Sequence, residues 1–249
     1  YEKVHQMKDM NELKRRLSQD RRFFSYFHPA LEDEPIIFVQ VALTNGLGKS
    51  IQELMKPSSN EQKLHDTATF YSISNCQEGL SRVTLGNFLI KRVVYEIQEE
   101  LPHIKRFGTL SPIPGFVEWF SYLEESKIKN ILANMVNQNM SFLKSQDLKI
   151  GDSRIIENKA ALKKLVAHYI VNEKNEKGLP INEVSRFHLG NGAIVEDITV
   201  NANVSEIGFK RSFGVMVNYL YVLKNIEKNH EDYINNKKVI VSDKITKYL

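Results

Sequence analysis

Two residues in this sequence have side chains and surroundings that could do chemistry: Ser111 and His188. Ser111 lies within Thr109-Leu-Ser-Pro-Ile-Pro-Gly-Phe116, directly before Pro112. A residue before proline is excluded from the helical region, and each proline fixes its own φ and removes a backbone donor. We therefore expect the Ser111 hydroxyl at a stiff corner where a strand ends, a place where enzymes often hold reactive groups. The same pattern also suits an ordinary turn or cap serine, and physical reasoning alone favours that role.

His188 could supply the complementary proton chemistry. It lies between Phe187 and Leu189, close to Gly190 and Gly192, in a segment whose glycines predict irregular structure. An imidazole can donate or accept a proton near neutral pH. A lone histidine of this kind is nevertheless more often structural than catalytic, so the sequence by itself leaves both roles open.

The pattern around Ser111 does not favour a serine hydrolase or a metal enzyme. The Gly-x-Ser-x-Gly motif is absent, and Pro112 offers no N–H for an oxyanion hole of the nucleophile-elbow type. No His-Glu-x-x-His or Cys-x-x-Cys spacing occurs, so no metal site is predicted.

The elements that must position these two residues follow from the apolar pattern. Alternating or continuous β-branched and aromatic runs predict strands, and apolar residues at helical spacing predict helices. A short helix of charged character precedes the first strand, and residues 121–173 have a helical pattern with no chemistry of their own. The predicted strands are Pro35–Thr44, Asp66–Ser74, Ala193–Val200 and Gly214–Leu223, and the predicted helices include Lys8–Arg22, Phe88–Leu101 and one starting at Phe116.

A loop before the helix at Phe88–Leu101 is a candidate anion site. Free N–H groups and the positive end of the helix dipole converge at a helix start. On spacing alone the signal is weak, because the loop has neither a phosphate-loop nor a dinucleotide pattern. The residues concerned are Ser81, Arg82, Val83, Thr84, Leu85, Gly86 and Asn87.

Three stretches resemble the malonyl-CoA decarboxylase family, in the family's order. Thr109–Phe116 resembles its serine motif, Ser185-Arg-Phe-His-Leu-Gly-Asn-Gly-Ala193 its histidine motif, and Gly214-Val-Met-Val-Asn-Tyr-Leu-Tyr221 its C-terminal strand. The resemblance runs from about Phe24 to Tyr221. It implies an α/β fold in the broad α+β sense, a GNAT-like mixed, largely antiparallel sheet flanked by helices, with residues 121–173 as a helical insertion.

The resemblance also implies a function. It predicts decarboxylation of malonyl-CoA to acetyl-CoA and CO2 by a Ser111–His188 pair, with no metal or organic cofactor and coenzyme A entering only as the substrate thioester. Tyr221 is preferred over Tyr219 as a third catalytic residue, and His28 is expected to be structural. The loop Ser81–Asn87 would bind the pyrophosphate and pantetheine of coenzyme A, although Thr84 stands where the family often has glutamate.

Two alternatives remain on the same sequence. One is a GNAT-type acyltransferase that uses acyl-CoA, and the other is an inactive acyl-CoA-binding regulatory module. Methylmalonyl-CoA is an alternative substrate. Nucleic-acid binding rests only on scattered basic pairs, and a net charge of +4 is too mild to imply it.

The remaining expectations concern organisation and surroundings. We expect one catalytic domain over residues 1–249, with a leading helix in residues 1–22 and without the helical domain that usually precedes it in the family. A homo-oligomer is expected only if such a helical domain exists in the full-length protein. With no long apolar run, we expect no membrane partner. A single cysteine, Cys76, excludes an internal disulfide. The expected location is the cytoplasm, or the mitochondrial matrix or another organelle in a eukaryote.

Overall fold

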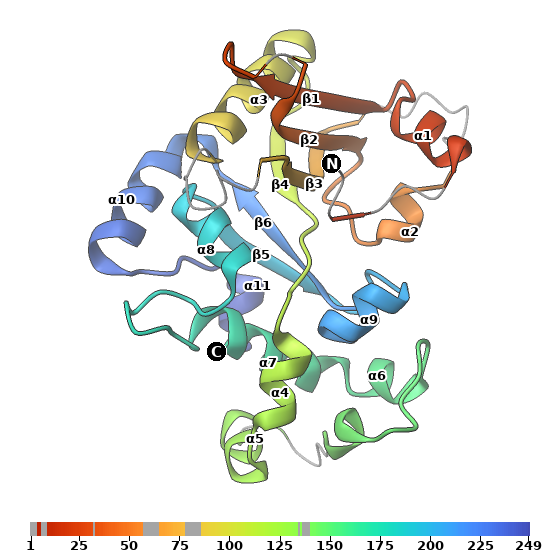
Figure 1. Ribbon diagram of the computed structural model, residues 1–249. Coiled ribbons are helices and arrows are strands. Elements are labelled where there is room, and N and C mark those ends of the chain that lie inside the picture. Colours follow the sequence, from red (N-terminus) through yellow and green to blue (C-terminus); the bar gives the residue numbers. More distant parts are fainter. Residues whose placement is uncertain are drawn as a thin grey trace. The chain divides into compact units, whose positions relative to one another are not determined.

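The computed structural model describes residues 4–5, 9–31, 33–56, 65–77, 86–133, 135 and 140–249, with only the backbone for residues 86–89. The chain divides into two compact units. Figure 1 labels their helices and strands. Unit 1 contains residues 1–110 and 220–222, and unit 2 contains residues 111–219 and 223–249.

The strands of unit 1 form most of a mixed sheet. Strands β1, β2 and β3 pair in antiparallel fashion, and β3 pairs with β4 in parallel. Strands β2 and β3 correspond to the strands predicted over Pro35–Thr44 and Asp66–Ser74. Most side chains on β2 and β3 are buried, which agrees with their runs of β-branched and aromatic residues. Their bounds are β1 (Arg21–Phe27), β2 (Pro35–Thr44), β3 (Thr67–Asn75) and β4 (Arg106–Thr109).

The helices described in unit 1 are α1 (Met10–Arg16), α2 (Ile51–Leu54) and α3 (Gly86–Glu100). The helix predicted over Lys8–Arg22 is therefore too long. Arg21 and Arg22 belong to β1, where Arg21 pairs with Ala42, because strand pairing outweighs the helical pattern of the local sequence. On α3 the predicted apolar stripe is buried at Ile90, Val93, Val94 and Ile97.

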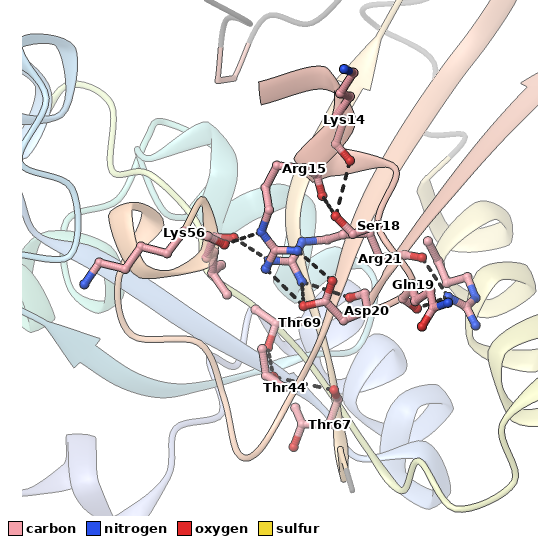
Figure 2. Close-up of polar contacts among 12 residues, drawn as sticks. Lys14, Arg15, Ser18, Gln19, Asp20, Arg21, Thr44, Lys56, Thr67 and Thr69 are labelled. Carbon is pink, nitrogen blue, oxygen red and sulfur yellow. Dashed lines mark hydrogen bonds and ion pairs between the residues drawn. The ribbon is translucent and has the colours of Figure 1, made fainter. Parts of the chain in front are cut away.

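A cluster of polar contacts ties the ends of α1, β1 and α2 together (Figure 2). Arg15 donates to both carboxylate oxygens of Asp20, at 2.6 and 3.0 Å, and its Nε donates to the carbonyl of Lys56. Burial alone would raise the pKa of Asp20, but the Arg15 hydrogen bond and the charges of Arg21 and Arg15 lower it overall. Nearby on β2 and β3, the hydroxyls of Thr44 and Thr69 lie 2.8 Å apart.

Unit 2 contains most of the described helices, one whole strand and residues 216–219 of the last strand, whose residues 220 and 221 belong to unit 1. The predicted strands at Ala193–Val200 and Gly214–Leu223 are confirmed with slightly shorter bounds, and residues 121–173 are largely helical as expected. The tail from Asn225 contains a surface helix. The elements are α4 (Phe116–Tyr122), α5 (Glu125–Ile131), the 3₁₀ helix η2 (Ser141–Lys144), α6 (Ser153–Glu157), α7 (Lys159–Val171), α8 (Glu183–Gly190), β5 (Ile194–Thr199), α9 (Glu206–Ser212), β6 (Met216–Tyr221), the 3₁₀ helix η3 (Leu223–Asn225), α10 (Ile226–Asn236) and α11 (Asp243–Thr246).

Hydrogen bonds give the strand order β1-β2-β3-β4-β6-β5. The end of β6 pairs with β4 in antiparallel fashion through Phe107 and Tyr221. Antiparallel pairs therefore predominate among the pairings with a known direction, and the predicted mixed, largely antiparallel sheet with helices is confirmed. In unit 2, α7 is buried along most of its length, and its sequence is accordingly apolar on several sides.

Candidate active site

The backbone of Ser111 is fixed in extended form at the start of unit 2. Its N–H donates to the carbonyl of Val217 at 2.8 Å, and its own carbonyl accepts from the Val217 N–H at 2.9 Å. This isolated antiparallel bridge confirms the extended conformation predicted from the following proline. Gly115 then takes a φ of +80°, which a residue without a side chain adopts readily, and α4 begins at Phe116.

His188 lies on α8, and this corrects the prediction that its segment is irregular. Asn182 caps the helix by accepting a hydrogen bond from the Ser185 N–H, and Glu183 adds a negative charge in the first turn. Both are helix-start signals that the sequence contains. The prediction failed because Gly190 and Gly192 indicate a loop, whereas in the structure they mark the helix end.

The two predicted catalytic side chains are in contact. Ser111 Oγ and His188 Nε2 lie 3.0 Å apart, although the residues are 77 positions apart in the chain. Ser111 is 5% exposed and His188 is 3% exposed. Burial lowers the pKa of His188 to about 3, so the imidazole of the resting protein is neutral around pH 7. A neutral imidazole beside a hydroxyl can exchange a proton with it, which is the arrangement that acid–base chemistry requires.

The aromatic ring against His188 is that of Tyr219. The two rings stack with centroids 4.6 Å apart and an angle of 25° between their planes. Phe187 meets the imidazole edge-on at 5.0 Å. The predicted third residue, Tyr221, belongs to unit 1, where it pairs with Phe107 and meets the Phe70 ring at 6.4 Å. A catalytic role for Tyr221 stays a prediction, and the ring that touches His188 is the one the sequence analysis ranked second.

The sequence analysis gave no role to three polar residues of unit 2: Tyr169, Asn182 and Ser185. The carbonyl of Pro114 accepts from the Tyr169 hydroxyl at 3.0 Å and from Asn182 Nδ2 at 2.8 Å. Ser185 Oγ lies 2.7 Å from the Tyr219 hydroxyl. Only Asn182 carried a usable signal, as an asparagine directly before a helical segment.

The predicted coenzyme A loop falls mostly outside the described residues. Ser81, Arg82, Val83, Thr84 and Leu85 lie outside them, whereas Gly86 and Asn87 begin α3. The binding role of the loop stays a prediction.

Other candidate sites can be placed as well. His28 is exposed, and its Nδ1 accepts from the Ala30 N–H at 3.1 Å, which is a turn contact. Within the described ranges, no group of three His, Cys, Asp or Glu side chains is placed to hold a metal ion. None of the described helices is long and apolar enough to cross a membrane.

The mixed sheet and its flanking helices have a GNAT-like fold. The loading GNATL domain of CurA from Lyngbya majuscula superposes with a TM-score of 0.51 at 13% identity, covering 89% of this chain and 85% of that one. GphF, described as a GNAT-like decarboxylase in complex with isobutyryl-CoA, gives a TM-score of 0.51 at 14% identity, with coverage of 86% and 84%. At such identities the likeness concerns the fold.

The family model for the malonyl-CoA decarboxylase C-terminal domain matches residues 1–249. The chain therefore belongs to the malonyl-CoA decarboxylase family. The mitochondrial malonyl-CoA decarboxylase of Anser anser anser is 34% identical, with coverage of 100% of this chain and 53% of the relative. The mitochondrial enzyme of Rattus norvegicus is 35% identical, with coverage of 98% and 54%. The chain thus spans about half the length of these curated relatives.

Solved structures agree with this assignment. The malonyl-CoA decarboxylase of Agrobacterium vitis superposes with a TM-score of 0.84 at 36% identity, covering 100% of this chain and 62% of that one. The malonyl-CoA decarboxylase of Rhodopseudomonas palustris gives a TM-score of 0.81 at 38% identity, with coverage of 99% and 61%. Family and fold therefore agree with what the three motifs predicted.

Proposed function

We propose that this chain decarboxylates malonyl-CoA to acetyl-CoA and CO2, with Ser111 and His188 as the catalytic pair and without a metal or organic cofactor. The observation that carries the proposal is the 3.0 Å contact between Ser111 Oγ and His188 Nε2 in a chain of this family. Acyl-CoA is accordingly the proposed ligand, and the loop Ser81–Asn87 is its proposed binding segment.

The reaction makes limited demands on a protein. The bond between the α-carbon and the carboxylate carbon breaks, CO2 leaves, and the electron pair is delocalised onto the thioester oxygen as an enolate. One proton taken up from solvent then completes the acetyl group. The thioester itself is the electron sink, so the protein needs to stabilise the enolate oxygen and direct the proton.

The environment of the pair suits these demands. Both side chains are buried, and hydrogen bonds to a developing charge are stronger where water is excluded. In our proposal Ser111 donates to the malonyl carboxylate or to the enolate oxygen. His188 polarises the thioester and passes the proton to the α-carbon. A negative charge beside the imidazole raises its pKa, so the ring that is neutral at rest takes up a proton as the enolate forms.

Measuring CO2 release from malonyl-CoA by Ser111→Ala and His188→Ala tests the assignment. Loss of one such donor commonly lowers kcat by about 10²- to 10³-fold, which is the expected effect of each substitution. Ser121→Ala and His103→Ala, both at exposed positions, are the matched controls and should keep the wild-type rate. Near-normal rates in both Ser111→Ala and His188→Ala would remove the assignment.

Product analysis separates the proposal from its alternatives. With and without an amine or a carrier thiol as acceptor, the wild-type protein should give the same acetyl-CoA and CO2. Acyl transfer that requires the acceptor would indicate an acyltransferase, and tight binding without turnover would indicate a regulatory module. Activity should also survive extensive dialysis against a chelator, and its loss would contradict the cofactor-free mechanism.

A further inference from the structure

Asn182 is a buried side chain with two separate contacts in unit 2. Its Oδ1 accepts from the Ser185 N–H at 2.9 Å and from Ser185 Oγ at 3.1 Å, which caps the start of α8. Its Nδ2 donates to the carbonyl of Pro114 at 2.8 Å. Asn182 is 2% exposed, so water does not offer replacement partners.

The chemistry of the neighbours determines which way the amide faces. A backbone N–H at Ser185 can only donate, so the amide atom facing it must be the oxygen. The Pro114 carbonyl can only accept, so the atom facing it must be the nitrogen. Only an amide at residue 182 satisfies both sides at this length of side chain.

The same side chain also reaches the imidazole through Ser185. The single hydroxyl hydrogen of Ser185 is donated to Asn182 Oδ1, so Ser185 Oγ accepts from the Tyr219 hydroxyl, 2.7 Å away. The Tyr219 ring stacks on His188. Asn182 therefore fixes the Ser185 hydroxyl, which accepts from Tyr219, and the Tyr219 ring packs on the imidazole.

On its other side, Asn182 holds the turn that carries Ser111. Pro114 follows Ser111 by three positions, and Pro112 and Pro114 leave that turn little freedom in φ. His188 follows Asn182 by six positions on a continuous helix. A hydrogen bond from Asn182 to Pro114 thus fixes the start of α8 against the Ser111 turn.

We propose that Asn182 is a positioning residue that keeps Ser111 Oγ and His188 Nε2 within hydrogen-bond distance by joining the Ser111 turn to the start of α8. Its effect on turnover rests on the proposed decarboxylase function, whereas its effect on the Ser111–His188 contact does not. A shift of about 1 Å in a reacting group can cost about 10²-fold in rate, so a small loosening of this joint has a measurable consequence.

Asn182→Asp removes the hydrogen bond to Pro114 and keeps the N-cap of α8. Aspartate has the same length and is an equally good N-cap, so α8 keeps its start. It has no N–H for Pro114 and places a second oxygen against that carbonyl. Asn182→Ser is the uncharged companion, because serine also caps but is too short to reach Pro114. The matched control is Asn175→Asp, whose Oδ1 accepts from the Lys177 and Leu179 N–H groups in a loop and would continue to do so.

The proposal predicts that kcat falls while KM stays nearly unchanged. In Asn182→Asp and Asn182→Ser, the thermal midpoint should fall because each variant loses the buried hydrogen bond to Pro114. In addition, kcat of the folded protein for malonyl-CoA should fall by about 10- to 100-fold while KM stays within about 2-fold. Asn175→Asp should match the wild type in all three quantities. A merely structural role would lower the thermal midpoint alone and leave kcat of the folded fraction unchanged, and that result in either Asn182 variant would overturn the proposal.

A structural readout keeps this test independent of the reaction. Crystal structures of the two Asn182 variants should show Ser111 Oγ and His188 Nε2 separated beyond 3.5 Å or the imidazole rotated off Tyr219. An unchanged contact in both would overturn the positioning role even if the wild-type protein is active. Conversely, a wild-type protein that releases no CO2 would refute the proposed function, while a separated pair in the variants would still support the role of Asn182.

Discussion

The buried, uncharged state of His188 should make unit 2 sensitive to mild acid. Burial lowers the pKa of this imidazole from 6.5 to about 3. The unfolded chain therefore binds a proton at His188 across that interval, while the folded protein does not. His188 thus favours the folded state above pH 6.5, and this advantage is lost as the pH falls below 6.5 toward 3.

The size of the effect follows from the two pKa values. Each pH unit between them changes the free energy of unfolding by about 1.4 kcal/mol for one proton. Lowering the pH from about 7.5 to about 5.0 should therefore remove about 2 kcal/mol of stability through His188 alone. With an ordinary urea dependence, this corresponds to a fall of about 1 M in the midpoint.

Urea unfolding of the wild type and His188→Gln at both pH values isolates this contribution. Glutamine does not titrate, and the remaining carboxyl and imidazole groups affect both proteins, so the difference between their pH dependences belongs to His188. The single tryptophan, Trp119, lies on α4 in the same unit and packs on Tyr169 at 5.0 Å, so its fluorescence reports on this unit. Equal pH dependence in the two proteins would refute the reasoning, because it would mean that His188 takes up a proton in the folded state as readily as in the unfolded state.

Two pairs of substitutions elsewhere test other parts of the structure. Gly192→Ala should destabilise by about 3 kcal/mol or more, because φ is +78° and a Cβ would lie 2.1 Å from the Ile226 carbonyl oxygen. Gly151→Ala, at φ +82° with nothing within 4 Å, isolates the cost of the backbone alone and should lose about 1 kcal/mol in the same urea assay. Asp20→Asn should lower the stability of unit 1 by about 1–2 kcal/mol, since it weakens the contacts with Arg15. Asp147→Asn, at a largely exposed ion pair with Arg154, should change stability by less than about 0.5 kcal/mol, and equal losses in the two aspartate variants would contradict the importance of the Arg15–Asp20 contacts.

The setting of Ser111 could be predicted from sequence because local rules govern it. The prolines at 112 and 114 restrict the backbone whatever the rest of the chain does, and Gly115 permits the left-handed turn before α4. Strands β2 and β3 were predictable for a similar reason, since their β-branched and aromatic runs exceed what a loop would contain. Resemblance to a family then supplied the pairing with His188, which no local rule provides.

The surroundings of His188 depend on contacts that sequence spacing does not contain. Period-two alternation places Tyr219 and Tyr221 on the same face of β6 but does not say which ring meets the imidazole. That choice depends on the packing of α8 against its neighbours. The bond from Asn182 to Pro114 joins residues 68 positions apart, and tertiary packing alone brings them together.

The antiparallel bridge between Ser111 and Val217 occupies both backbone polar groups of the serine. Its main chain is thereby part of the framework, and rotation about the Cα–Cβ bond is the torsion that remains for the side chain. The position of the hydroxyl therefore depends on χ1 of Ser111, and in the structure it lies 3.0 Å from His188 Nε2. In the proposed reaction the acyl group must approach a hydroxyl whose backbone is held in place, so acyl groups of different shape should differ in how well they reach it.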